Sequence, residues 1–300
     1  PDEQGKWMVT LDPLAVSAES RNLTITGKNQ IVLNDVLVGE VWIAAGQSNM
    51  EWHLKQIHPE EQAYAQTIKS NNLVRAFHVT HHLHAGFPLD DTIGLWKTGA
   101  TMADGTSVSA VGFFFAHKLQ KELGVPVALL DVNWGGQAIE PFIPLEGYDA
   151  LKIPFHHRHP GHPAKTIAAQ MKQYQTQLDK AIAANEKGLR TAVPPMHIMG
   201  HAQNALYNAI VAPLTPYGVK GAIWYQGESN RGSADYYKKL QALSAGWSTV
   251  FKVKDIPFYQ VQIAPFDYSH GADHDADMLC KNIWAAQYKG AEEIPGMGIV

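Results

Sequence analysis

VWIAAGQSNM, residues 41–50, is the segment that decides the fold class of this chain. Its first five residues are apolar and predict a buried β-strand, and Gly46 then permits a tight bend. Because ligands bind at the carboxyl ends of strands in open α/β sheets, Ser48 is placed where a substrate would lie. A following helix N-terminus would favour a developing negative charge there. The alternative is an ordinary helix N-cap, and the G-x-S-x-G pattern is incomplete because Met50 replaces its second glycine.

Two further segments repeat this arrangement of an apolar strand that ends in glycine and polar residues. They are VALLDVNWGG at residues 127–136, followed by Gln137, and GAIWYQGESN at residues 221–230. Backbone N–H groups at glycines and an asparagine amide are the donors that an oxyanion hole requires. The three strand ends therefore predict one shared site at the same edge of a parallel sheet.

Three motifs together carry a resemblance to a known family. They are GQSNM at 46–50, NWGG at 133–136 and WYQGESN at 224–230. The chain resembles the SGNH-type carbohydrate esterases, and within them the sialate O-acetylesterase (sialic acid-specific 9-O-acetylesterase) group, which includes acetylxylan-esterase-like proteins. The resemblance extends from about residue 6 to the C-terminus, and segments 35–42 and 206–214 are also similar to family sequence.

The resemblance implies roles for individual residues. Ser48 matches the nucleophile. Gly136, or alternatively Gly135, and Asn230 match the oxyanion hole, in which the Ser48 N–H would be the third donor. The residues expected to shape the substrate pocket are Gln47, Asn49, Trp134, Gln226 and Glu228. Trp134 is placed to stack on a sugar face, and Glu228 has the alternative role of a general base.

The catalytic base is not identified by the sequence. The resemblance implies an Asp-x-x-His after the last strand, but residues 296–300 look like the start of that strand. We therefore expect the histidine beyond residue 300, with the domain lacking its C-terminal end. The literal match Asp267–His270 makes His270 an in-chain candidate, although it follows the preceding strand. A serine without an adjacent base is a poor nucleophile, so the chain is a fragment, uses an unrecognised histidine, or is not catalytic.

Alternating strand and helix patterns predict a doubly wound parallel sheet with helices on both faces, a three-layer α/β/α architecture. The resemblance implies that this is the flavodoxin-like SGNH hydrolase fold. The expected strands are 41–45, 73–79, 127–132, 219–224, 257–263 and 297–300, and the expected helices are 59–70, 109–123, 163–187, 201–212, 233–251 and 276–289. Short alternating segments at 6–10, 22–26 and 30–33 predict a small β appendage. We divide the chain into residues 1–38, the tail of a β-sandwich, and residues 39–300, the esterase domain.

Composition excludes several other classes of protein. The chain has 300 residues and a formal net charge of −4, without a basic stripe that would suit nucleic acid or an anionic membrane surface. No apolar run approaches the roughly 20 residues of a membrane span. The single cysteine, Cys280, excludes an intrachain disulfide. No signal peptide begins at Pro1, but the resemblance implies a secreted or periplasmic protein. The sequence does not indicate an oligomeric state.

Histidines form two groups among the 15 in the chain, and imidazole is a common metal ligand. The groups are His78, His81, His82 and His84, and His156, His157, His159 and His162. Metal sites usually mix in carboxylate or cysteine ligands and lie on defined elements. We therefore interpret these histidines as solvated or substrate-loop residues, and expect no metal and no cofactor.

The sequence leads to a serine esterase that removes O-acetyl groups from carbohydrates, with sialate O-acetylesterase as the main interpretation. An acetylxylan esterase or another glycan deacetylase is the alternative within this class. The partner is then an acetylated carbohydrate, either sialic acid or a plant polysaccharide. The alternative from another class is a carbohydrate-binding pseudo-enzyme that lacks the catalytic base.

Overall fold

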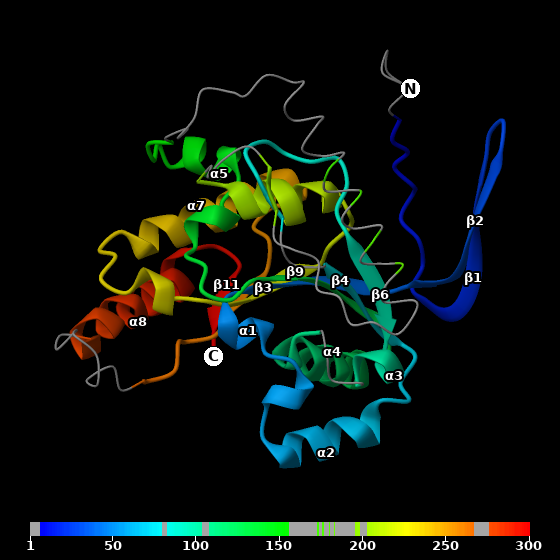
Figure 1. The fold of residues 1–300 in the computed structure, drawn as a ribbon, viewed down its shortest axis with the longest axis horizontal. Coiled ribbons are helices and arrows are strands. Elements are labelled where there is room, and N and C mark those ends of the chain that lie inside the picture. The colour runs from blue at the N-terminus through cyan, green and yellow to red at the C-terminus, as the bar shows by residue number, and fades with distance from the viewer. Residues whose placement is uncertain are drawn as a thin grey trace.

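The computed structural model of the chain is built on one large sheet (Figure 1). It describes residues 7–79, 83–103, 108–155, 196–198, 203–266 and 276–300, and the helical positions 173, 176, 180 and 183. The strand order of the sheet is β11-β10-β9-β3-β7-β4-β6. Its strands are β3 (Glu40–Gly46), β4 (Val74–Val79), β6 (Gly94–Thr98), β7 (Val127–Asn133), β9 (Gly221–Tyr225), β10 (Phe258–Gln260) and β11 (Met297–Ile299). β6 pairs antiparallel with β4, and every other neighbouring pair is parallel.

The order of the strands places a topological switch point at β3. The next two parallel strands of the chain, β4 and β7, lie on one side of β3, whereas β9, β10 and β11 lie on the other. In doubly wound sheets this is where a crevice opens at the carboxyl ends of the strands. The expected doubly wound α/β fold is confirmed, and Ser48 follows the strand at the switch point.

Side chains of β3 alternate between two cores because successive residues of a strand point to opposite faces. Ile43 and Ala45 join the core on one face, whereas Trp42 and Ala44 join the core on the other. The second face is covered by α2 (Pro59–Ile68), α3 (Gly99–Met102) and α4 (Ala110–Leu123), and the first by α5 (Leu145–Ala150), α7 (Tyr236–Val250) and α8 (Ala276–Glu293) (Figure 1). The sheet is thus the middle of three layers.

Helix α4 begins and ends where its capping residues predict. The Ser109 hydroxyl accepts a hydrogen bond from the Gly112 N–H at 3.0 Å, which satisfies one N–H of the first turn. Gly124 ends the helix in the left-handed conformation, with φ of +69°. The expected helix over 109–123 is therefore confirmed.

Several short elements connect the larger ones. They are α1 (Ser48–Glu51), the 3₁₀ turns η1 (Leu54–Gln56), η2 (Glu140–Phe142), η4 (Ala212–Leu214) and η5 (Glu228–Asn230), the π-helical turn η3 (Tyr207–Val211), and the parallel pair β5 (Leu83–Ala85) and β8 (Met196–Ile198). The expected helix near 201–212 is confirmed at residues 205–211, where it is mostly π-helical, and the 3₁₀ turn that follows contains Pro213, which cannot continue an α-helical ladder. The expected helix over 163–187 falls outside the described residues except at four helical positions.

The N-terminal part forms an antiparallel hairpin of β1 (Ser17–Thr26) and β2 (Gln30–Val38), which projects beyond the β6 edge (Figure 1). The expected strand at 6–10 is wrong for its described part, because residues 7–10 are not in a strand. An alternating pattern forms a strand only where another strand pairs with it. Arg75 of β4 holds the hairpin: its Nη2 lies 2.9 Å from Asp35 Oδ2, and its Nη1 donates to the Asp35 carbonyl. The domain boundary at 38/39 stays a prediction.

Gly46 is required where β3 approaches β9, and its replacement tests this constraint. Gly46 has φ of +148°, and a Cβ atom there would lie 2.2 Å from the Tyr225 carbonyl oxygen. We expect Gly46→Ala to lower the free energy of unfolding by about 3 kcal/mol or more, because the backbone of one strand must shift. Gly124→Ala is the control. Gly124 has φ of +69°, but no atom lies within 4 Å of the position that a Cβ would take, so this variant should lose only the conformational cost of about 1–2 kcal/mol. Urea unfolding measures both, and equal losses would contradict the steric explanation.

Candidate esterase site

Ser48 lies at the start of α1, directly after the end of β3. The preceding residue, Gln47, is extended and donates its backbone N–H to the Tyr225 carbonyl at 3.0 Å. This bond ties the β3–α1 turn to the end of β9. Ser48 is half-buried, and its N–H is in the first turn of a helix, where backbone N–H groups have no partner within the helix. The serine is therefore presented at the sheet edge together with a backbone donor.

The turn after β7 lies against α1. The Trp134 N–H donates to the Gly46 carbonyl at 3.0 Å, and the Gly135 N–H donates to Glu51 Oε2 at 2.5 Å. A Cβ atom on Gly135 would lie 3.7 Å from Ser48 Cα, so the turn passes close to the nucleophile candidate. Gly136 has φ of +71° and faces open space. Since Glu51 takes the Gly135 N–H, this geometry favours Gly136 over Gly135 as the oxyanion donor.

Two buried glutamines join the strand ends. Gln47 Oε1 accepts hydrogen bonds from Gln226 Nε2 at 3.0 Å and from the Ser229 N–H at 3.1 Å. The Gln226 side chain also donates to the Gln137 carbonyl and accepts from the Tyr236 hydroxyl at 2.8 Å. Gln226 is fully buried and Gln47 nearly so. Their positions favour a framework role, in which they hold the loops around Ser48, over direct contact with substrate.

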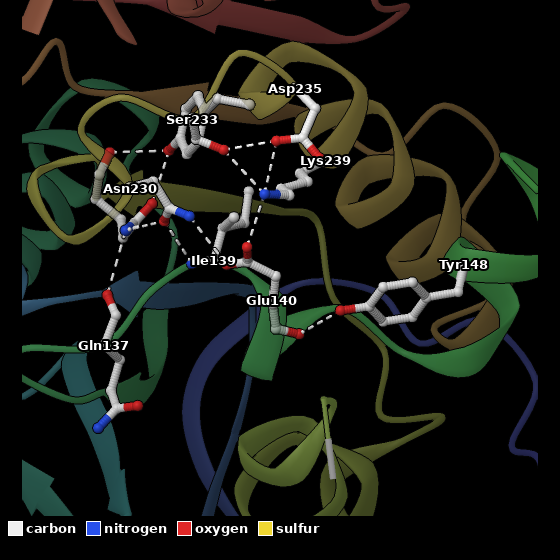
Figure 2. A network of polar contacts seen from close by, with 10 residues as sticks. Gln137, Ile139, Glu140, Tyr148, Asn230, Ser233, Asp235 and Lys239 are labelled. Carbon is white, nitrogen blue, oxygen red and sulfur yellow. Dashed lines mark hydrogen bonds and ion pairs between the residues drawn. The ribbon is translucent and has the colours of Figure 1, made fainter. Parts of the chain in front are cut away.

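Asn230 ends the η5 turn after β9, and its amide is held on both sides (Figure 2). Its Oδ1 accepts from the Ile139 N–H and from Gln226 Nε2, both at 2.8 Å. Its Nδ2 donates one hydrogen to Glu140 Oε2 at 2.9 Å. The side chain is only 6% exposed. An amide nitrogen carries two hydrogens, and the second makes no hydrogen bond to a described residue, so it is available to a ligand in a fixed orientation.

A charged network supports Asn230 from behind. Lys239 Nζ lies 2.7 Å from Glu140 Oε1 and 2.7 Å from Asp235 Oδ1 (Figure 2). Burial lowers the pKa of Lys239, but the hydrogen bonds to Asp235 and Glu140 outweigh it and raise that pKa overall. Our reading of the sequence missed this network, because Glu140 and Lys239 belong to no motif and are brought together only by folding.

Asn49 and Glu228 form a second polar pair beside Ser48. Asn49 Nδ2 donates to Glu228 Oε1 at 2.7 Å. Glu228 Oε2 is buried and has no hydrogen bond to any described residue. Burial is the main cause that raises the pKa of the Glu228 carboxyl, although Asn49 and the nearby charge of Arg231 oppose it.

The described members of the first histidine group, His78 and His84, lie in different parts of the structure. His84 lies against Trp134, with ring centroids 4.5 Å apart, so it is next to the glycine turn. His78 pairs instead with the buried Asp131, with 2.7 Å between Nδ1 and Oδ2, on the α4 side of the sheet. His81, His82, the whole 156–162 group and the candidate base His270 lie outside the described residues.

No group of three or more histidine, cysteine or acidic side chains able to hold a metal occurs within the described parts of the chain. The helices in those same parts include none that is long and apolar enough to cross a membrane. For the Ser48 hydroxyl, no hydrogen bond to a histidine is found among the described side chains. The identity of the base therefore stays a prediction.

Glu51 is the other site residue that sequence reasoning missed. It lies one helical turn after Ser48, and this spacing places both residues on one side of a helix. That spacing is the signal that could have pointed to Glu51. Its contact with the Gly135 N–H joins residues 84 positions apart, which no local pattern predicts.

Comparison with known proteins agrees with this architecture. Residues 38–290 match the family model described as "SASA: Carbohydrate esterase, sialic acid-specific acetylesterase". The sialate O-acetylesterase of Rattus norvegicus is 28% identical and that of Mus musculus 27%; each match covers 89% of this chain and 52% of the relative. The chain thus spans about half the length of these curated relatives.

A solved structure extends the comparison to three dimensions. The crystal structure of a carbohydrate acetylesterase from Xanthomonas citri superposes with a TM-score of 0.73 at 29% identity, covering 100% of this chain and 58% of that chain. The family match includes all three strand ends that surround Ser48. Since that match extends over most of its residues, this chain belongs to the carbohydrate esterase family of sialic acid-specific acetylesterases.

Proposed function

We propose that the protein containing this chain is a serine esterase that removes O-acetyl groups from carbohydrates, with acetylated sialic acid as its main substrate class. One observation carries the proposal: Ser48 stands at the switch point of the sheet, and the Gly135–Gly136 turn passes close to it. The Gln47 side chain ties the loop after β9 to the turn that carries Ser48. The family match and the sialate O-acetylesterases among its relatives support this substrate class.

In the proposed mechanism the Ser48 hydroxyl attacks the acetyl carbonyl carbon. The carbonyl oxygen becomes an oxyanion that accepts hydrogen bonds from the Ser48 N–H, the Gly136 N–H and the second hydrogen of Asn230 Nδ2. A histidine takes the serine proton and gives it to the departing sugar oxygen. Water then attacks the acetyl-serine and releases acetate. The histidine is proposed to lie beyond residue 300, and His270 is the in-chain candidate.

The sugar is proposed to lie between Trp134 and the Asn49–Glu228 pair. The Trp134 ring is partly exposed and offers an aromatic surface, on which sugar rings stack. Glu228 Oε2 is placed to accept a hydrogen bond from a sugar hydroxyl. The family resemblance supports a secreted or periplasmic location. Acetylated xylan is the alternative substrate, and a carbohydrate-binding protein without a base is the alternative function.

Replacement of the nucleophile tests the proposal in the full-length protein. We expect Ser48→Ala to abolish acetate release from O-acetylated sialic acid, because the covalent route is lost. Gln30→Ala on the exposed hairpin is the control and should leave the rate nearly unchanged. Assaying acetylated xylan in parallel distinguishes the two substrate classes. Sugar binding by the unaltered protein without any acetate release would contradict the esterase and favour the binding protein.

The second prediction concerns the oxyanion donor. Asn230→Ala is expected to lower kcat by about 10²–10³-fold with a smaller change in KM, because the amide acts mainly on charge of the transition state. The change also removes buried hydrogen bonds, so Gln260→Ala is the matched control: Gln260 is fully buried on β10 and donates to the Gln287 carbonyl at 2.7 Å. Thermal unfolding and kinetics are measured for both. If both variants lose kcat in proportion to stability, Asn230 has no specific role in catalysis.

A further inference from the structure

Glu51 contacts the glycine turn from the helix that carries Ser48, and none of the roles described above uses this contact. Its Oε2 accepts the Gly135 N–H at 2.5 Å. We propose that Glu51 is a positioning residue of the esterase: its side chain holds the 134–136 turn so that the Gly136 N–H faces the oxyanion. This inference rests on the proposed function of Ser48.

Hydrogen bonds hold the turn on both sides of Gly136. Its last backbone bond to the sheet runs from the Trp134 N–H to the Gly46 carbonyl. Two glycines follow, and glycine has the widest range of backbone conformations. Gly136 has φ of +71°, and no atom lies within 4 Å of the position that a Cβ would take. The Gly135 bond to Glu51 fixes the turn one residue before the proposed donor, and the bond from Gln226 Nε2 to the Gln137 carbonyl at 3.2 Å fixes it one residue after.

The contact also requires glycine at position 135. A Cβ atom there would lie 2.4 Å from Glu51 Oε2, so an alanine would displace the carboxylate. The same Cβ position is 3.7 Å from Ser48 Cα, which shows how closely the turn approaches the nucleophile. Ser48 and Glu51 are the first and last residues of α1. One helical turn thus sets the position of both the nucleophile and its oxyanion donor.

A positioning role for Glu51 can be distinguished from an electrostatic role, because the negative charge of its side chain would not assist the reaction. A carboxylate near a developing oxyanion raises the energy of the transition state, since like charges repel. A hydrogen bond that orients the turn lowers that energy. Glutamine keeps an acceptor oxygen and removes the charge, so a positioning role survives Glu51→Gln and is lost in Glu51→Ala.

Kinetics of the full-length protein on O-acetylated sialic acid test the inference. Glu51→Ala is expected to lower kcat about 10–100-fold with KM changed less than about twofold, because small displacements of catalytic groups cost this much. Glu51→Gln should stay within about threefold of the unaltered protein, with the same pH profile. Glu60→Ala on the exposed start of α2 is the matched control and should leave kcat unchanged.

A double variant gives the sharpest result. Gly135→Ala should lower kcat like Glu51→Ala, and adding it to Glu51→Ala should cost little more, because both changes break the same contact. Full additivity, or loss of kcat in Glu51→Gln equal to that in Glu51→Ala, would overturn the inference. If Ser48→Ala leaves hydrolysis unchanged, the proposed function itself fails. If Ser48→Ala abolishes hydrolysis while Glu51→Ala behaves like Glu60→Ala, only the role of Glu51 is wrong.

Discussion

The buried side chain of Gln47 is the contact on which the arrangement of the site depends. Its single carbonyl oxygen accepts from Gln226 Nε2 and from backbone N–H groups of the loop after β9. The residue lies between Gly46, which allows β3 and β9 to approach, and Ser48. A buried polar group without partners destabilises a fold, so this oxygen restrains where the β9 loop can lie. The serine and the loop that carries Asn230 are therefore linked by one amide.

The site is built as a rigid framework around a small number of available donors. Asn230 Oδ1 accepts from Gln226 Nε2 and from the Ile139 N–H, and Gln226 Oε1 accepts from the Tyr236 hydroxyl. In the low dielectric of the interior these bonds are strong only when every member is satisfied. Such a network costs little reorganisation during a reaction. Preorganised donors of this kind are what stabilisation of an oxyanion requires.

Three carboxylates surround a site that is proposed to hold a negative charge. Each of them accepts a hydrogen bond from another segment: Glu51 from the glycine turn, Glu140 from Asn230 and Glu228 from Asn49. The Glu140 charge is also balanced by Lys239 at 2.7 Å. The raised pKa of Glu228 follows from burial and disfavours its charged form. These contacts limit the repulsion that unpaired carboxylates would exert on an oxyanion.

The sequence by itself determined the individual strands and helices whose formation depends on residues close together in the chain. The apolar run before Gly46 predicted β3 and the position of Ser48 at its end, and the sequence pattern over 109–123 predicted α4, which Ser109 and Gly124 cap. These predictions succeeded because strand and helix periodicity and helix capping are properties of short segments. The same local reasoning failed at residues 7–10, where an alternating pattern has no strand to pair with. Nor did it predict that the helix near 201–212 is π-helical at Tyr207–Val211.

Tertiary structure alone decided which distant residues meet. The antiparallel β6, the pairing of β5 with β8, and the contacts of Glu51 with Gly135 and of Glu140 with Asn230 join segments far apart in the chain. Such contacts depend on strand order and loop paths, which no single segment specifies. The motifs named the residues at the strand ends, and the fold assigned the buried glutamines to the framework. The physical reason is that a hydrogen bond is fixed by distance and orientation, and these are set only when the sheet has assembled.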